Sequence, residues 1–442
     1  MDQSNAASDA VARYYDADAE REWARMDRHR TEFAVTLRAL AEHLPPPSAR
    51  VLDCGGGPGR YAIELARQGY QVTLFDLSAG NLRLAREKVA EAGVTLAGYE
   101  QGTATDLARF ANDSFDAVLL LGPLYHLLEA EERAGALAEA GRVLRAGGPL
   151  FVAFISRYAA HRDAAQRVPT WLVEDAVQAE TLLTSGRLAG GREGGEGGPQ
   201  FVAYMAHPAE VAPACWRAGF EVLAVLGVEG LVSVIEDGGV NVLTGAAWDA
   251  WADLNYRVAA DPSIHGCVEH LLVVARKPRW RGGLRQIAQR LDAAGVRYRV
   301  VGGASPALHG VPLIVNDIDI ETDAAGAYAF QAHFPEHVLE PVALREGDAY
   351  RSHFGRFDFD GVTVEVMGDL HRREGARWAP TSAVTETMVD LDGVPVRVST
   401  LEEETLAYIR RGKLARAAQC LSYCDHGRLV ALLRGEQMIM VL

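Results

Sequence analysis

The chain has 442 residues, of which 49% are hydrophobic and 23% charged, a balance typical of a folded protein that excludes intrinsic disorder. That length exceeds one ordinary hydrophobic core, so we expect two or three domains. The formal net charge is −15. Most of the excess acid falls in the first 278 residues, which disfavours binding of nucleic acid there and favours small-molecule partners.

The apolar runs, the N-terminal segment and the cysteines indicate the cellular compartment to expect. No apolar run is long enough to span a membrane, and the polar, charged segment 1–30 is unlike a signal peptide. The five cysteines are scattered and odd in number, which favours reduced thiols over a disulfide framework. We therefore expect a cytoplasmic protein without a membrane partner.

The first part of the chain alternates between predicted helices and strands. Residues 8–43 have apolar positions at helical spacing, and Pro45–Pro47 end that helix. Beyond them the pattern predicts strands at 50–54, 71–75, 115–121 and 149–155, and helices at 61–68, 79–92 and 130–144. This alternation is typical of a parallel, doubly wound α/β sheet.

The rhythm is interrupted at 156–200, which ends in the glycine-rich stretch 190–198, interpreted as a mobile loop. It resumes with a helix at 207–218 and strands at 221–227 and 270–275. We interpret residues 279–284 as a linker between a first domain, 1–278, and a second, 285–442. The basic residues around this linker fit a solvated connector better than an RNA contact.

A glycine loop separates the first predicted strand from the helix that follows. Glycines at 55, 56, 57 and 59 follow Asp53 and Cys54, and the next strand ends at Asp76. Glycines let a ligand approach the backbone, and an acid at the end of the second strand can accept ribose hydroxyls. A carboxylate before the glycines would repel a pyrophosphate, so Asp53 favours a ligand with an ammonium group.

With segments 103–107, 115–127 and 146–148, this pattern closely resembles the class I S-adenosylmethionine (SAM)-dependent methyltransferases over about residues 12–278. The resemblance implies a Rossmann-like sheet, SAM as cofactor and a small-molecule methyl acceptor. It implies that the following residues bind the cofactor: Asp53, Gly55, Gly57, Gly59, Asp76, Leu77, Thr105, Asp106, Leu121 and Tyr15.

The catalytic residues of this domain are less defined. Tyr125 and His126 follow the C-terminal end of a strand, where open α/β sheets bind ligands. His126 could act as a general base toward a hydroxyl or amine, or it could only shape the pocket; His161 and His207 are less favoured. The resemblance also implies an N-terminal lid that includes Tyr15, although core packing explains its aromatic residues equally well.

A second set of polar residues lies beyond the linker. Gly302, Gly303 and Ser305 follow a predicted strand, and Asp317 and Asp319 occupy positions i and i+2 of another. Carboxylates two residues apart on a strand share a face and can share a metal ion. Glu365, on a later strand, could complete a three-carboxylate set for two Mg²⁺ ions.

This second set resembles the nucleotidyltransferase superfamily, which includes polymerase beta and the antibiotic nucleotidyltransferases, clearly over about residues 285–370. The resemblance implies a smaller α+β domain that uses an NTP and Mg²⁺, with Lys413 of a helical tail near a phosphate. Two alternatives stay open: a non-catalytic nucleotide-binding or oligomerisation module, compatible with a homodimer, and an RNA-modifying enzyme that uses the basic stretch 276–299.

Overall fold

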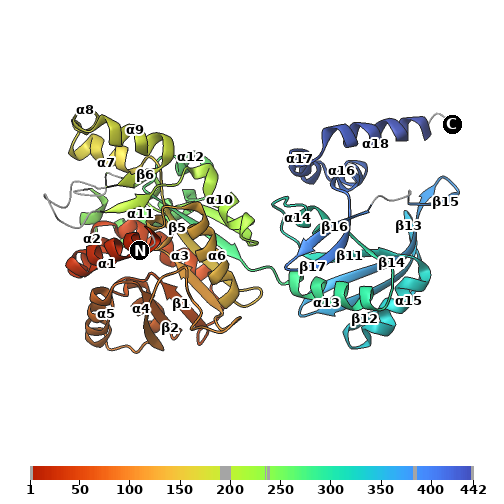
Figure 1. Cartoon of the computed structure of the whole chain (residues 1–442), viewed down its shortest axis with the longest axis horizontal. Coiled ribbons are helices and arrows are strands. Elements are labelled where there is room, and N and C mark those ends of the chain that lie inside the picture. The colour runs from red at the N-terminus through yellow and green to blue at the C-terminus, as the bar shows by residue number, and fades with distance from the viewer. Residues whose placement is uncertain (1–2, 190–200, 234, 236–238, 382–385, 440–442) are drawn as a thin grey trace. The chain divides into compact units, whose positions relative to one another are not determined.

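The computed structural model describes residues 3–189, 201–233, 235, 239–381 and 386–439. The chain divides into two compact units, Met1–Lys277 and Pro278–Leu442 (Figure 1). The glycine-rich stretch 190–198, expected to form a mobile loop, lies outside the described residues. Within the described part of the chain, no helix is both long enough and apolar enough to cross a membrane.

A seven-stranded sheet forms the centre of the first unit, in the order β3-β2-β1-β4-β5-β9-β8. Strands β1 to β5 pair in parallel, whereas β9 is antiparallel to both β5 and β8. The predicted doubly wound α/β fold is confirmed, with an antiparallel strand near one edge. The strands are β1 (Arg50–Cys54), β2 (Gln71–Asp76), β3 (Gly98–Gln101), β4 (Ala117–Leu120), β5 (Pro149–Ile155), β8 (Glu221–Gly227) and β9 (His270–Arg276).

Helices cover both faces of this sheet because its strands are apolar on both sides. Along β1, Leu52 and Cys54 contribute to one hydrophobic cluster, which includes α6 (Ala130–Val143) and α10 (Pro208–Arg217). Val51 contributes to the opposite cluster, as alternation along a strand requires. That cluster includes residues of α3 (Arg30–His43), α4 (Arg60–Arg67) and α5 (Ala79–Glu91).

The single helix expected over residues 8–43 is wrong, because the segment forms three helices: α1 (Gln3–Ala17), α2 (Ala19–Arg28) and α3. Asp18 makes the first break. Its side chain is the N-cap of α2 and accepts a hydrogen bond from the N–H of Arg21. His29, with φ −106° and ψ 55°, makes the second break. The breaks let α1 pack on α5 while α3 covers the sheet.

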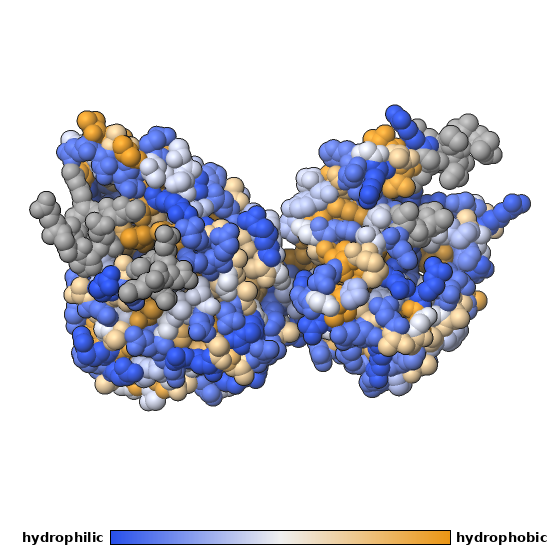
Figure 2. Space-filling view, viewed as in Figure 1, coloured by the Kyte–Doolittle hydropathy of each residue, from blue (hydrophilic) through white to orange (hydrophobic). Residues whose placement is uncertain are grey.

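Between β5 and β9 the chain adds further elements to the first unit. They include a two-stranded sheet of β6 (Arg187–Ala189) and β7 (Val202–Tyr204). Exposed Leu172, Val173 and Val177 make the surface over α8 and α9 apolar (Figure 2). The remaining elements of the first unit are η1 (Leu124–His126), which follows β4, and then α7 (Ala159–Arg167), α8 (Trp171–Glu174), α9 (Ala176–Ser185), η2 (Gly230–Val232), η3 (Val240–Val242), α11 (Gly245–Val258) and α12 (Pro262–His265).

An eight-stranded mixed sheet forms the second unit, in the order β12-β13-β14-β11-β10-β17-β16, with β15 paired to β14. The pairs β11–β14 and β10–β17 are parallel, and the others are antiparallel. The strands are β10 (Arg299–Val301), β11 (Asp317–Thr322), β12 (Val338–Glu346), β13 (Tyr350–Phe359), β14 (Val362–Glu374), β15 (Arg377–Pro380), β16 (Glu386–Leu391) and β17 (Val394–Ser399). The predicted smaller α+β fold is confirmed.

The helices of this unit form two groups: some pack on the sheet, and the others follow it at the C-terminal end of the chain. Helix α13 (Trp280–Ala293) and α15 (Ala324–His333) bury apolar residues in the main core. The expected linker at 279–284 is therefore wrong from Trp280 onward, because Trp280 and Leu284 are buried helical residues. The other elements are α14 (Ala304–Leu308), η4 (Pro335–His337), α16 (Leu401–Arg410), α17 (Leu414–Leu421) and α18 (His426–Ile439).

Candidate functional sites

The glycine loop between β1 and α4 forms one wall of a cavity in the first unit. Gly55 and Gly57 have φ values of +73° and +57°, a region where side chains are disfavoured. A Cβ atom on Gly55 would lie 2.5 Å from Cδ of Pro123, and one on Gly56 would lie 2.5 Å from the Asp53 carboxylate. The loop therefore packs closely on both neighbours while its backbone faces the cavity.

Asp53 is a buried carboxyl group whose pKa is lowered only by the backbone of Ala62 and by no basic side chain. The residue is fully buried and lines the cavity. Neither carboxylate oxygen has a hydrogen-bond partner within the described part of the chain. Burial, and then the neighbouring Asp76, raise the pKa of Asp53 to about 7. Because an unpaired buried carboxylate is costly, this position favours a ligand that brings a positive charge.

Asp76, at the end of β2, is held in place by the backbone around it. Its Oδ2 accepts a hydrogen bond from the N–H of Gly57, and its Oδ1 accepts one from the N–H of Ser78, both at 2.8 Å. The Asn81 side chain donates to the same Oδ1, while its own Oδ1 is buried without a partner among the described residues. Asp76 and Asn81 together offer fixed acceptors on the cavity wall.

Most residues expected to bind the cofactor line this cavity: Asp53, Gly55, Gly57, Asp76, Leu77, Leu121 and Tyr15. Three of them do not. Gly59 packs against Leu74 and Ala85 at the start of α4. Asp106 is exposed and accepts a hydrogen bond from the N–H of Ala108, and Thr105 bonds to the hydroxyl of Thr103. The wall at this point is made instead by Gly102, Thr103 and Ala104.

Tyr125 and His126 also line the cavity, on η1 after β4. Nδ1 of His126 donates to the carbonyl of Val202 at 2.8 Å, so Nε2 is free to accept a hydrogen bond from the hydroxyl of Tyr15 at 2.7 Å. Burial lowers the pKa of His126 to about 4. The imidazole is therefore neutral, and its acceptor nitrogen is already occupied by Tyr15.

Two charged residues of α2 line the cavity without having been expected from the sequence. Arg25 donates through Nε to Glu22 at 3.2 Å and through both terminal nitrogens to Glu32, at 2.8 and 3.1 Å. Glu22 and Arg25 lie at positions i and i+3 on the polar face of a helix. From the sequence such a face is expected to be exposed to solvent, so these two residues were not predicted to line a cavity. The other expected histidines lie elsewhere: His161 bonds to the Ala179 carbonyl, and His207 caps α10.

In the second unit, the expected carboxylates meet on one face of the sheet. Cα pairing places Asp319 of β11 directly beside Glu365 of β14. Ile318 and Ile320 point to the opposite face, into the hydrophobic core, so Asp317 and Asp319 share the face away from it. Burial, followed by the charges of Asp317 and Glu365, raises the pKa of Asp319 to about 7.

These carboxylates have the chemistry that Mg²⁺ requires, namely several oxygen donors with excess negative charge. Glu365, however, accepts a hydrogen bond from Arg356 through Oε1 at 2.8 Å, so the guanidinium group competes with a metal ion for this carboxylate. Gly302 permits the approach of Asp319: its φ is +66°, and a Cβ there would overlap the Asp319 carboxylate. The residues therefore fit a cation, with one competing partner to displace.

Other expected residues of this site take different places. Ser305 is fully buried, and its hydroxyl donates to the carbonyl of Ser399 at 3.0 Å, so it supports the loop and does not face a ligand. Lys413 is exposed at the start of α17. Near Gly303 the structure places Arg416, whose Nη1 lies 3.4 Å from the position of a Cβ on that glycine. Arg416, and not the expected Lys413, therefore lies beside Gly303.

Comparison with known proteins finds a family match in each unit. Residues 51–148 match a family described as a methyltransferase domain, and residues 283–419 match the family of aminoglycoside-2''-adenylyltransferases. A ubiquinone biosynthesis O-methyltransferase of Xanthomonas axonopodis pv. citri is 36% identical over 123 residues, 28% of this chain and 50% of that protein. The chain thus spans about half the length of the curated relatives it matches.

Two solved structures resemble one unit each. One, from Thermotoga maritima and assigned to the nucleotidyltransferases, is 35% identical and covers 33% of this chain and 93% of its own, with a TM-score of 0.30. The other, a SAM-dependent methyltransferase of Methanosarcina mazei, is 19% identical and covers 54% and 97%, with a TM-score of 0.38.

Fold, site and family matches together define a chain made of two transferase domains. The first unit carries a methyltransferase domain over residues 51–148, and the second carries a domain of the aminoglycoside-2''-adenylyltransferase family over residues 283–419.

Proposed function

We propose that the first unit transfers a methyl group from SAM to a hydroxyl group of a small molecule. The observation that carries this proposal is Asp53, a fully buried carboxylate without a partner among the described residues, facing a glycine-lined cavity. The ammonium group of SAM supplies the missing positive charge. When bound, SAM provides an electrophilic methyl group on a sulfonium, which needs mainly an aligned acceptor.

Each residue of the cavity has a role in this proposal. Asp53 binds the ammonium group, Asp76 accepts from the ribose hydroxyls, and the glycine loop excludes water beside them. The acceptor hydroxyl lies near Tyr15 and His126. His126 is neutral, so its Nε2 can take a proton, either through the Tyr15 hydroxyl or directly once Tyr15 moves away. The name of the Xanthomonas relative favours oxygen as the methylated atom.

We further propose that the second unit transfers a nucleotide from an NTP to a small molecule. Asp317, Asp319 and Glu365 would hold Mg²⁺, which neutralises the phosphates during transfer. The matched family favours adenylylation of an aminoglycoside hydroxyl, with ATP as the NTP. In this proposal both units modify small molecules, and the chain works in the cytoplasm.

The proposal is tested by incubating the purified chain with SAM, ATP, Mg²⁺ and single aminoglycosides or small phenols. Mass spectrometry would detect a methyl or an AMP adduct, and a coupled assay would detect pyrophosphate. We expect Asp53→Asn to reduce the methyl adduct alone, and Asp317→Asn with Asp319→Asn to abolish the AMP adduct alone. ATP binding without pyrophosphate release from any acceptor would instead indicate a non-catalytic nucleotide-binding module.

A further inference from the structure

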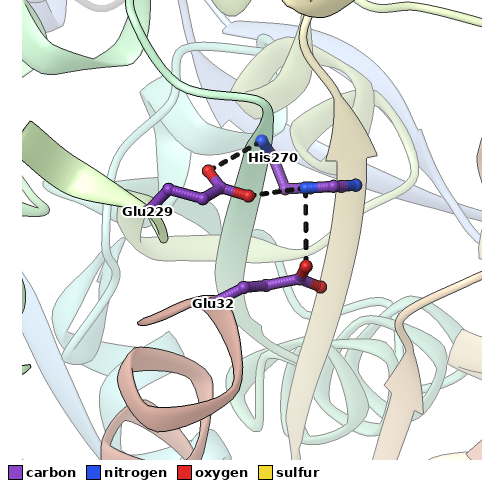
Figure 3. A group of neighbouring side chains, drawn as sticks. All are labelled: Glu32, Glu229 and His270. Atoms are coloured by element: carbon purple, nitrogen blue, oxygen red, sulfur yellow. Dashed lines mark hydrogen bonds and ion pairs between the residues drawn. The ribbon is translucent and has the colours of Figure 1, made fainter. Parts of the chain in front are cut away.

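A second buried polar cluster lies in the first unit, behind the proposed SAM cavity. Glu32 of α3, Glu229 of the turn after β8 and His270 of β9 converge on one point (Figure 3). Nδ1 of His270 lies 2.6 Å from Oε1 of Glu229 and 3.6 Å from Oε2 of Glu32. One ligand atom from each residue lies within 4.8 Å of the others.

The two carboxylates are held by other groups, in the way that outer contacts orient metal ligands. Oε2 of Glu229 accepts two hydrogen bonds, from the N–H groups of Glu269 and His270, which leaves Oε1 directed at the imidazole. Glu32 is held by the two hydrogen bonds from Arg25. Both glutamates are buried, with exposed fractions of 7% for Glu32 and 0% for Glu229.

The backbone that carries Glu229 is also fixed. Gly230, the next residue, has a φ of +56°, and a Cβ there would overlap the side chain of Asn255. Asn255 is fully buried, accepts from the N–H of Leu231 and donates to the carbonyl of Trp251. The position of Glu229 is therefore set by the fold and does not depend on its contact with His270.

Although each carboxylate of this cluster has hydrogen-bond partners, Glu32 and His270 face each other without a direct hydrogen bond. The single hydrogen on Nδ1 of His270 can be donated well to one carboxylate, and at 3.6 Å Glu32 is beyond hydrogen-bonding distance. A small cavity lies directly beside the cluster, lined by Glu32, Thr36, Tyr61 and His270, among others. This cavity borders Glu32 and His270 and is about the size of one water molecule.

We propose that Glu32, Glu229 and His270 bind one divalent transition-metal ion, of the class of Zn²⁺, Mn²⁺ or Co²⁺. An imidazole nitrogen with two carboxylate oxygens is a ligand set that these ions accept. The ion takes the place of the hydrogen on Nδ1, and the oxygen of Glu229 retreats by less than about 1 Å to reach a bond length of about 2.1 Å.

Such an ion would clamp the N-terminal helices to the sheet. Glu32 lies on α3, whereas Glu229 and His270 belong to the opposite end of the unit's sequence. Arg25, which bonds to Glu32, lines the SAM cavity. Metal binding should therefore stabilise the wall of that cavity, although the site lies outside the proposed reaction.

The test is a titration of the EDTA-stripped full chain with Co²⁺, followed by visible absorption. Because Asp317 and Asp319 could also bind Co²⁺, the titration uses the background Asp317→Asn with Asp319→Asn. We expect d–d bands that saturate at one ion per chain and disappear on addition of Zn²⁺. Adding His270→Gln should weaken Co²⁺ binding by more than about tenfold, whereas the matched change His265→Gln should not.

A second readout covers the case in which His270→Gln does not fold. Zn²⁺ should raise the unfolding temperature of the first unit in the same background, and Glu229→Gln should remove that rise. Absence of saturable Co²⁺ bands in the folded chain would overturn the proposal. So would bands, or a Zn²⁺ stabilisation, that persist unchanged in His270→Gln and Glu229→Gln, and the cluster would then be a hydrogen-bonded network only.

Discussion

The hydroxyl of Tyr15 lies 2.7 Å from Nε2 of His126, although the two residues are 111 positions apart in the sequence. The bond joins α1 to the 3₁₀ turn after β4 and closes one side of the proposed SAM cavity. It also fixes which nitrogen of His126 carries the proton, because the carbonyl of Val202 can only accept from Nδ1. The proposed base is thus held neutral, with Nε2 as its acceptor.

His126 should make the stability of the first unit depend on pH. Its pKa falls from 6.5 to about 4 on folding, so the unfolded chain binds more protons between these values. Stability is present above pH 6.5 and is lost as the pH falls toward 4, by on the order of 3 kcal/mol. Because Asp53 acts in the opposite sense over the same range, the test is a difference: between pH 4 and 7, urea unfolding should give a stability that rises more with pH in the wild type than in His126→Gln. An equal slope in both would contradict it, and the partly exposed His371→Gln is the control.

Asp53 should affect the pH dependence of stability in the opposite direction from His126. Its pKa rises from 3.8 to about 7 on folding, so the unfolded chain loses its proton first. The penalty grows as the pH rises from about 4 to 7 and reaches on the order of 4 kcal/mol above that range. In the absence of SAM, Asp53→Asn should therefore stabilise the first unit at pH 8 and have little effect near pH 4. Denaturant unfolding measures both, and a loss of stability at pH 8 would show that Asp53 has a partner.

Gly302 should be intolerant of a side chain for two separate reasons. Its positive φ alone costs an alanine about 1–2 kcal/mol, and the Cβ would also overlap Asp319. Gly310, with φ +86° and nothing within 4 Å of its Cβ position, isolates the first cost. Thermal unfolding should therefore show a larger loss for Gly302→Ala than for Gly310→Ala. Equal losses would mean that Asp319 does not approach the glycine.

Ser305 should affect stability and not ligand binding. Its buried hydroxyl bonds to the carbonyl of Ser399, whose own hydroxyl bonds to Ser305 and Glu404. Removing it in Ser305→Ala leaves buried polar groups unsatisfied and should cost about 1–3 kcal/mol. The exposed Ser422→Ala should be neutral. If Ser305→Ala left the stability unchanged and weakened ATP binding, the prediction would be contradicted, and Ser305 would be a nucleotide-binding residue.

The sequence predicted those parts of the two sites that follow from strand order. Asp53, Asp76 and Tyr125 come at the ends of neighbouring parallel strands, which meet at one edge of the sheet. In the same way, Asp317 and Asp319 share a face because strand side chains alternate. These inferences need only the local pattern, and the structure places the residues accordingly.

Contacts between segments far apart in the sequence could not be predicted from the local pattern. The role of Arg25 depends on breaks in the N-terminal helix that only Asp18 and His29 reveal, and neither residue is a strong helix breaker. The burial of Ser305 depends on β17, which lies 94 residues further along the chain. The cavity is lined by Gly102–Ala104 and not by the expected Thr105 and Asp106. These residues lie in a loop, where side chains do not alternate regularly between faces.

The most direct test of the account is calorimetric titration of the chain with SAM. We predict one binding site per chain in the wild type and in Asp106→Asn, whose carboxylate is exposed. Asp53→Asn should weaken binding by at least about tenfold, because a charge-assisted contact contributes about 1.5–3 kcal/mol, and Asp76→Ala should weaken it as well. No binding by the wild type, or an unchanged affinity in Asp53→Asn, would contradict the assignment of this cavity to SAM.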